Sequence, residues 1–124
     1  MATTDMLDKA TAEAFANDWI VSWNSHDLER ILHHYAEHFE FSSPFIIQIG
    51  QQPSGVLRGK RAVRAYWAKA LARIPNLQFR LESVLWGINS LVINYHRHDG
   101  RIASEWFEFG SDGKVVKSSA HYAA

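Results

Sequence analysis

Apolar and polar side chains alternate along two runs of residues, 91–98 and 101–109, that flank Asp99-Gly100. An Asp-Gly pair between such runs predicts a β-hairpin, because a type I′ turn needs positive φ at both central residues. A two-residue turn fixes the register and places Asn94 opposite Glu105. The residues predicted to share their face are Val92, His96, Ala103 and Phe107. The opposite face is predicted to carry Ile93, Tyr95, Arg97, Ile102, Ser104, Trp106 and Glu108.

The first third of the chain has the spacing of helices. Apolar residues recur at three- and four-residue steps over residues 5–24, which predicts an amphipathic helix. Asp27 is a good N-cap for a second, shorter helix over residues 27–36. The buried stripe of this second helix is predicted to contain Leu28, Ile31, Leu32 and Tyr35.

The remaining segments alternate between strand and helix patterns. The predicted elements are a strand at 39–41, an extended piece at 45–49, a loop at 50–59, a helix at 60–73, and strands at 77–86 and 114–122. Pro75 should stop the helix, and Ser111-Asp112-Gly113 should form a turn before the last strand. Helices followed by antiparallel strands predict a single α+β domain over residues 1–124, with the helices packed on one face of a curved sheet.

Composition excludes several classes of function. The 13 basic and 13 acidic residues cancel without forming a charge block, which argues against a nucleic-acid partner. The chain has no cysteine, so neither a disulfide framework nor a thiolate metal site is possible. Residues 1–10 lack the pattern of a signal peptide, and no apolar run approaches the length that spans a membrane. We therefore expect a cytoplasmic protein without a membrane partner.

Three strings of residues carry a resemblance to a known family. They are WNSHDLERILHHYAEHFEFSSP at 23–44, RGKRAVRAYW at 58–67 and EFGSDGKVV at 108–116. In order and spacing they resemble the nuclear transport factor 2-like (NTF2-like) superfamily, especially its SnoaL-like and ketosteroid-isomerase-like branch. The resemblance implies a cystatin-like cone, in which a curved antiparallel sheet packs on about three N-terminal helices and leaves a pocket at its wide end. Dimers through the outer sheet face are common in this superfamily.

The sequence departs from the steroid isomerases of that branch at two positions. Their catalytic Asp would stand before Pro44, where this chain has Ser43, and their oxyanion-binding Tyr falls near Trp19. Their second oxyanion-binding acid is matched by Glu105. SnoaL-like cyclases also use an acidic residue and a His, and Glu105 is the position that matches. The resemblance therefore implies the fold, and steroid-isomerase activity is not expected.

Glu105 is the leading candidate for chemistry. A carboxyl on a covered face has either a structural partner, such as Asn94, or a role as acid, base or ligand anchor. Three roles are open for Asn94: to orient this carboxyl, to donate to a substrate carbonyl, or to act as an ordinary strand hydrogen-bonder. His96, further along the same face, is either a proton shuttle near neutral pH or a solvated residue beside the turn. The predicted cavity around the three catalytic candidates is lined by Trp19, Ser43, Phe107 and Tyr122.

Histidines elsewhere invite a metal hypothesis. His34 and His38 are four residues apart, a spacing that can chelate a metal on a helix. However, the second helix is predicted to end near residue 36, and no carboxylate or third His is placed beside them. We expect no metal site, and the proton-transfer chemistry predicted for Glu105 needs no cofactor.

Two functions remain open on the sequence. The first is a small isomerase-, cyclase- or dehydratase-type enzyme that acts on an apolar, carbonyl-bearing molecule by proton transfer. The second is a non-catalytic module that binds a small apolar ligand or serves as a dimeric accessory domain. In either case Ile93, Tyr95, Ile102 and Trp106 are predicted to form an uncovered apolar face and to make a homodimer.

Overall fold

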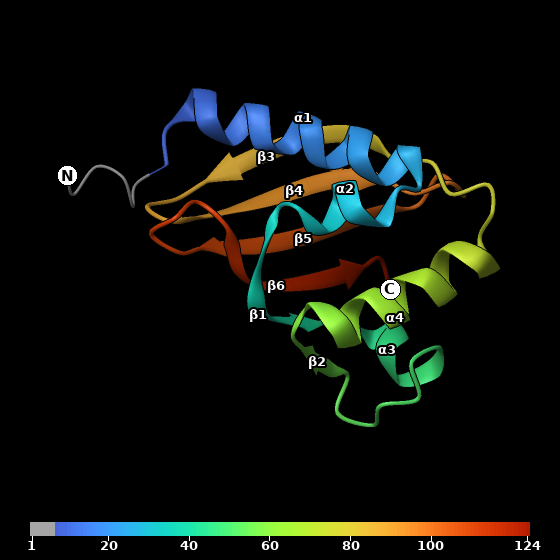
Figure 1. The fold of residues 1–124 in the computed structure, drawn as a ribbon. Helices are drawn as coiled ribbons and strands as arrows, with labels where there is room; N and C mark the ends of the chain where they lie inside the picture. The colour runs from blue at the N-terminus through green and yellow to red at the C-terminus, as the bar shows by residue number, and fades with distance from the viewer. Residues whose placement is uncertain (1–6) are drawn as a thin grey trace.

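A six-stranded sheet and four helices make up the α+β fold seen in a computed structural model, which describes residues 7–124 (Figure 1). The elements in chain order are α1 (Lys9–Ser25), α2 (Leu28–Leu32), β1 (Tyr35–Ser42), α3 (Pro44–Gln48), β2 (Val56–Arg58), α4 (Lys60–Arg73), β3 (Arg80–Trp86), β4 (Ser90–His96), β5 (Ile102–Phe109) and β6 (Val115–Tyr122). The predicted fold class is confirmed.

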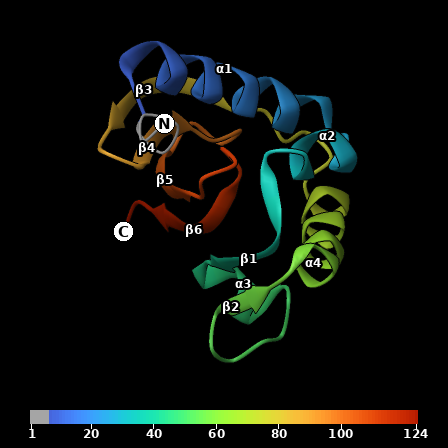
Figure 2. The ribbon, with the colours of Figure 1, turned by 60° about the vertical axis from the view of Figure 1, so that its left-hand side comes forward.

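The strand order in the sheet is β2-β1-β6-β5-β4-β3. Strands β3 to β6 form an antiparallel meander, whereas β1 runs parallel to β6 and antiparallel to β2. The pairing of β1 with β6 shifts register between Tyr35 and Glu40, and such an irregularity bends a strand. The sheet is therefore curved, and α1 and α4 lie on its concave side (Figure 2).

Helix α1 supplies the largest part of the core. Asp8 caps its start by accepting a hydrogen bond from the Thr11 backbone N–H, and His26 ends it in the left-handed region at a φ of 61°. The buried face of α1 carries Ala12, Ala16, Trp19, Ile20 and Trp23, which pack onto the sheet. No helix within residues 7–124 is long and apolar enough to cross a membrane.

The boundaries of the N-terminal elements differ from those predicted. Helix α1 begins at Lys9, and part of the predicted start, at residues 5 and 6, lies outside the described residues. Asp27 does cap α2, but that helix ends at Leu32 and not at residue 36, because the chain enters β1 at Tyr35. Tyr35, predicted on a helix stripe, is therefore a buried strand residue.

Two predictions around Pro44 are wrong. Residues 44–48 form the short helix α3 and not an extended piece, because Ser43 accepts a hydrogen bond from the Phe45 N–H and Pro44 suits the first helical position. The predicted loop at 50–59 contains strand β2, which pairs with β1. By contrast, the helix predicted at 60–73 matches α4, and Tyr66 and Trp67 are buried on it as expected.

The β4–β5 hairpin is present, but its turn has three residues and not two. The Arg97 N–H donates to the Arg101 carbonyl at 2.8 Å, the Gly100 N–H donates to the Arg97 carbonyl at 2.9 Å, and Gly100 has a φ of 84°. This is the geometry of a turn closed by a glycine bulge. The extra residue shifts the register by one, so that Ile93 stands opposite Glu105.

A one-residue shift moves every β4 side chain to the other face. Ile93 and Tyr95 therefore face the core, with exposed fractions of 0% and 2%, and their predicted place on the outer face is wrong. Asn94 and His96 face outward in their stead, away from Glu105. The physical reason is that burying an isoleucine and a tyrosine is more favourable than burying an amide and an imidazole.

We predict that Gly100→Ala lowers the free energy of unfolding by about 1 kcal/mol, because an L-residue is strained at this φ. Gly100→Asn is the matched control and should lose less, since Asn tolerates the left-handed region. Urea unfolding of the three proteins measures both effects. Equal stability of the wild type and the Ala variant would contradict the glycine-bulge turn.

Candidate functional site

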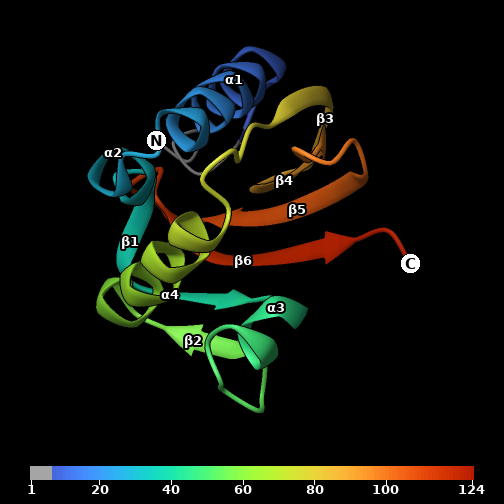
Figure 3. The same cartoon turned by 90° about the vertical axis from the view of Figure 1, so that its right-hand side faces the viewer.

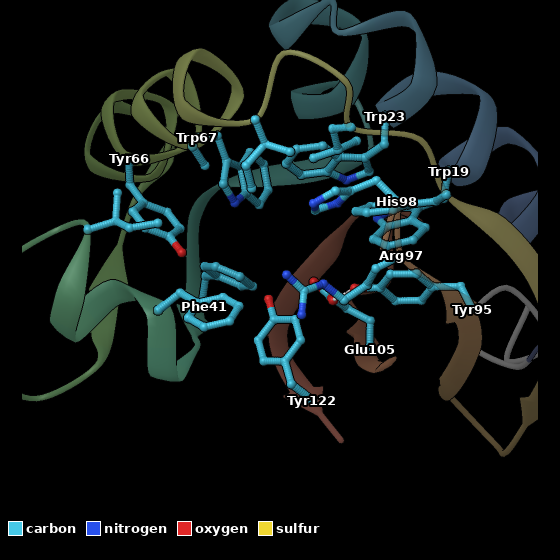
Figure 4. A pocket seen from close by; sticks show the side chains of 16 residues that line it. Trp19, Trp23, Phe41, Tyr66, Trp67, Tyr95, Arg97, His98, Glu105 and Tyr122 are labelled. Atoms are coloured by element: carbon cyan, nitrogen blue, oxygen red, sulfur yellow. Dashed lines mark hydrogen bonds between the residues drawn. The ribbon is translucent and has the colours of Figure 1, made fainter. Parts of the chain in front are cut away.

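A cavity of about 70 Å³ lies between the helices and the inner face of the sheet. Most of its wall is aromatic, and Figure 4 shows these rings converging from α1, α4 and the strands. The aromatic residues of the wall are Trp19, Trp23, Phe41, Phe45, Tyr66, Trp67, Phe79, Tyr95 and Tyr122. The charged or titratable groups other than tyrosine are Arg97, His98 and Glu105.

Glu105 projects from the centre of β5 into this cavity. Its exposed fraction is 4%, and it stands between Ile93 of β4 and Ala120 of β6 in the sheet. The Tyr95 hydroxyl donates a hydrogen bond to Glu105 Oε1 at 3.2 Å. Within residues 7–124, no Lys, Arg or His lies within 4 Å of the carboxylate.

The surroundings of Glu105 favour its neutral form. Burial raises the pKa of Glu105 from the ordinary 4.5 to about 8, even though the hydrogen bond from Tyr95 lowers it. A carboxyl with this pKa exists in both protonation states near neutral pH. It can therefore act as an acid or as a base near neutral pH, whereas an ordinary glutamate is almost fully ionised there and is available only as a base.

All four tyrosines of the chain lie within electrostatic reach of Glu105. Burial raises the pKa of Tyr66 to about 12, and it also raises the pKa of Tyr35, Tyr95 and Tyr122 well above the ordinary value. The charge of Glu105 adds to each of these increases. These hydroxyls therefore stay protonated at neutral pH. The cavity thus offers one titrating carboxyl among neutral hydroxyl groups.

Two of the four residues predicted to line the cavity do so. Trp19 and Tyr122 are part of its wall, and the Trp19 indole donates to the Tyr35 hydroxyl at 3.1 Å. Phe107 is fully buried behind Trp19, with ring centroids 5.5 Å apart, and lies outside the lining. Ser43 is also buried outside the lining, where it caps α3.

Asn94 and His96 do not join Glu105. Asn94 donates to the Ser83 hydroxyl at 3.0 Å and accepts from the Ser104 hydroxyl at 2.5 Å, on the outer face of the sheet. His96 Nε2 lies 2.8 Å from a Glu82 carboxylate oxygen on that same face. The predicted grouping of the three residues is wrong because it depended on the two-residue turn.

His98 is a cavity residue that sequence reasoning missed, and Trp23 is part of the same wall. His98 Nδ1 and Trp23 Nε1 are both buried, and neither has a hydrogen-bond partner among the described residues. An unpaired buried N–H or ring nitrogen is costly, so both are candidates to bind a polar atom of a ligand. The predicted hairpin put His98 directly before its turn, and in the fold this residue lines the cavity.

Arg97 is a further cavity residue that the predicted site omitted. Its register places it on the inner face, next along from Tyr95. The guanidinium carbon lies 5.1 Å from the Tyr122 ring centroid and 5.3 Å from that of Phe45. Figure 4 shows the guanidinium pointing into the cavity between Tyr122 and Glu105.

His34, one of the two histidines of the metal hypothesis, has protein partners, and His38 is exposed on β1. His34 Nε2 lies 3.0 Å from Asp18 Oδ2 and 3.3 Å from the Ser22 hydroxyl, and burial lowers its pKa. Both contacts use the same ring nitrogen, so the three residues do not form a nucleophilic triad. The described part of the chain contains no group of three His, Cys, Asp or Glu residues arranged to hold a metal.

A bent six-stranded sheet that encloses an aromatic cavity against helices is the fold of proteins described as NTF2-like or cystatin-like. Residues 16–118 match the model of the SnoaL-like domain family, and the chain belongs to that family. No curated protein matches the sequence.

Solved structures agree with this assignment. A SnoaL-like protein of unknown function from Burkholderia thailandensis is 50% identical, with a TM-score of 0.91 over 96% of this chain and 99% of that one. A putative isomerase of the SnoaL-like family from Agrobacterium tumefaciens is 16% identical, with a TM-score of 0.72 over 91% and 97%. TerC, crystallised with polyporic acid, is 13% identical, with a TM-score of 0.72 over 90% and 92%. The last two likenesses are of fold.

The raised pKa of Glu105 predicts a specific dependence of stability on pH. Between about pH 4.5 and pH 8 the folded state holds a proton that the unfolded state releases, so stability falls as pH rises through this window. Glu105→Gln has no carboxyl at this position, so it does not contribute this dependence on pH. Its stability relative to the wild type should rise across the window by an amount on the order of 5 kcal/mol.

Urea unfolding at several pH values measures this difference. Tyr95→Phe is the matched variant: it removes the hydrogen bond that lowers the pKa of Glu105, so its window should extend to higher pH. A constant difference between wild type and Glu105→Gln from pH 5 to pH 8.5 would show that the carboxyl titrates normally.

Proposed function

We propose that this SnoaL-like protein is a cofactor-independent enzyme that moves a proton on a small, apolar, carbonyl-bearing molecule, with Glu105 as the proton-transfer group. The observation that carries the proposal is a buried carboxyl with a pKa of about 8 inside an aromatic cavity. A general acid or base works best when its pKa lies near the operating pH. A purely structural glutamate gains nothing from such a setting.

The proposed step is proton abstraction next to a carbonyl group. Ionised Glu105 takes the proton, and the electron pair of the broken C–H bond moves into an enolate whose oxygen gains the negative charge. Protonated Glu105 then returns the proton to another atom of the same conjugated system. At pH 7 roughly a tenth of the carboxyls are ionised when the pKa is about 8, so both forms are available.

Neutral donors in the cavity support this step. Tyr95 already donates to Glu105 and fixes the carboxyl, a role that the sequence left open for Asn94. The unpaired Trp23 N–H donor, and His98 in its Nδ1-protonated tautomer, can donate to an oxygen that becomes negative. His98 is thus the histidine of the proposed site in place of His96, and its role is to donate a hydrogen bond and not to shuttle a proton.

Cavity size favours a small substrate. A volume of about 70 Å³ is well below the roughly 300–1,000 Å³ typical of sites for drug-sized ligands. A compact aromatic or alicyclic ketone suits the aromatic walls better than a steroid does. The neighbour TerC, crystallised with polyporic acid, and the neighbour described as a putative isomerase fit a family that handles small organic molecules.

The alternative is a protein that binds such a molecule without converting it. One observation favours it: Glu105 is the only carboxylate among the cavity-lining residues of the described chain. By the resemblance, Ser43 and Trp19 stand where a steroid isomerase has its catalytic base and its tyrosine. A binding protein would hold the ligand carbonyl with Glu105 protonated. Both alternatives use the same cavity and differ in whether proton exchange follows binding.

Deuterium exchange into 2-tetralone tests the proposed function. In D₂O the wild-type protein should accelerate exchange at the carbon next to the carbonyl, and Glu105→Gln should reduce this acceleration by about 100-fold or more. NMR of the ketone measures the rate. The matched control is Glu108→Gln, the same chemical change on the outer face of the same strand, which should leave the rate unchanged.

Equal rates for the wild type and Glu105→Gln would refute the catalytic role. Binding of 2-tetralone without exchange above the buffer rate would favour the binding-protein alternative. Thermal melting of each variant separates a lost catalytic group from a lost fold.

We also propose that the protein forms a homodimer through the outer face of the sheet. With the observed register, Leu85, Val92 and Trp106 form an apolar row across three strands. A shallow groove lined by residues that include Val92 and Trp106 continues this row across β6 to Ser42 of β1. The helices cover the concave face, so a second copy of the chain is the partner that best suits this surface.

Trp106→Glu should dissociate such a dimer, because a carboxylate would be desolvated near the interface centre. Sedimentation at tens of micromolar protein, roughly the weak end of specific affinities, measures the assembly state. Val21→Glu is the matched control: it adds the same charge to a half-exposed apolar residue of α1, away from the outer face, and should leave the dimer intact. A monomeric wild type would overturn the proposal.

A further inference from the structure

We infer that Arg97 is an anion-binding residue of the cavity, and that the molecule bound there is an organic anion, such as a carboxylate, with an apolar body. The inference deepens the proposed function, because it names the chemical class of the substrate for the same cavity. It depends on the placement of Arg97, which the corrected hairpin register reveals.

The guanidinium of Arg97 is held in a fixed position. It lies over the rings of Phe45 and Tyr122, at 5.3 and 5.1 Å from their centroids, and these two rings pack on each other at 4.4 Å. The Arg97 backbone closes the hairpin through both hydrogen bonds of the turn. A cation stacked in this way is ordered before a ligand arrives, which lowers the entropy cost of binding.

Arg97 also has unused hydrogen-bonding capacity. Its nearest carboxylate is that of Asp99, at 3.8 Å, whereas Arg30 and Arg58 pair with carboxylates at 3.2 Å. Its side chain donates no hydrogen bond to any residue from 7 to 124, although its exposed fraction is only 15%. Five N–H donors on a planar fork match a carboxylate, and here they face the cavity.

The charge balance of the cavity agrees with an anionic ligand. Glu105 is not within ion-pair distance of Arg97, and its raised pKa leaves it mostly protonated at pH 7. The cavity then holds the positive charge of Arg97 beside apolar walls, and the nearest carboxylate, that of exposed Asp99, lies 3.8 Å away. A ligand carboxylate placed on Arg97 would neutralise that charge, while the aromatic rings would contact its apolar body.

Benzoate and benzamide test the inference, since they have nearly the same size and shape and differ in charge. With Trp19, Trp23 and Trp67 in the wall, tryptophan fluorescence reports occupancy of the cavity. The wild type at pH 7 should bind benzoate about tenfold more tightly than benzamide, a factor equal to about 1.4 kcal/mol. Arg97→Gln should bring this ratio to about one while it keeps the affinity for benzamide.

Two further variants sharpen the test. Arg101→Gln, the matched control, removes the same charge from an exposed residue of the same hairpin and should keep the tenfold preference. Arg97→Lys keeps the positive charge but lacks the planar guanidinium, so it should retain part of the preference for benzoate. A wild type that binds both compounds equally, or binds neither, would overturn the inference, and so would a preference that survives in Arg97→Gln.

The outcome is separable from that of the ketone exchange assay. An Arg97-dependent preference for benzoate without any proton exchange would keep the anion site and remove the proposed reaction. Exchange that depends on Glu105, without a preference for benzoate, would keep the reaction and remove the anion site.

Discussion

Burial of Ile93 and Tyr95 sets the register of the β4–β5 hairpin, and the cavity depends on that register. Burying each of these side chains is worth about 1.5–3 kcal/mol relative to leaving it exposed, and the alternative register would bury Asn94 and His96 instead. The three-residue turn at Gly100 makes the favourable pairing possible. Through this register Tyr95 reaches Glu105, and Arg97 reaches the rings of Phe45 and Tyr122.

Desolvation then gives the cavity its chemistry. Glu105 is buried among apolar and tyrosine side chains, and no Lys, Arg or His nitrogen of the described residues lies within 4 Å of its carboxylate, so its charged form is disfavoured. The aromatic wall also leaves Trp23 Nε1 and His98 Nδ1 without hydrogen-bond partners among residues 7–124. The unpaired nitrogens and the raised pKa of Glu105 have the same cause: aromatic rings enclose all of these polar groups. This arrangement suits a ligand that supplies the missing polar contacts.

The fold was largely predictable from the sequence, because long periodic segments such as α4 and the local strings of the SnoaL-like family determine it. Glu105 was predictable as well, since a carboxyl between apolar strand residues is informative in itself. The β4 residues that lie beside Glu105 were not predictable, because they depend on whether the hairpin turn has two residues or three. Asp-Gly is compatible with turns of two or three residues, and the choice is made by tertiary burial of Ile93 and Tyr95, which a local pattern does not contain.

The position of β6 has a consequence for how the molecule is assembled. This strand, although late in the sequence, lies in the middle of the sheet, with β5 on one side and β1 on the other (Figure 3). The Ser42 hydroxyl bonds to Ser119, 77 residues away. Contacts between residues so far apart in sequence slow folding, because the entropy cost of closing the long loop comes before the contacts contribute stabilising energy. We therefore expect the cavity walls from the two halves of the chain to come together late in folding. During synthesis the aromatic side chains of α1 and α4 stay uncovered until the C-terminal strands have been made.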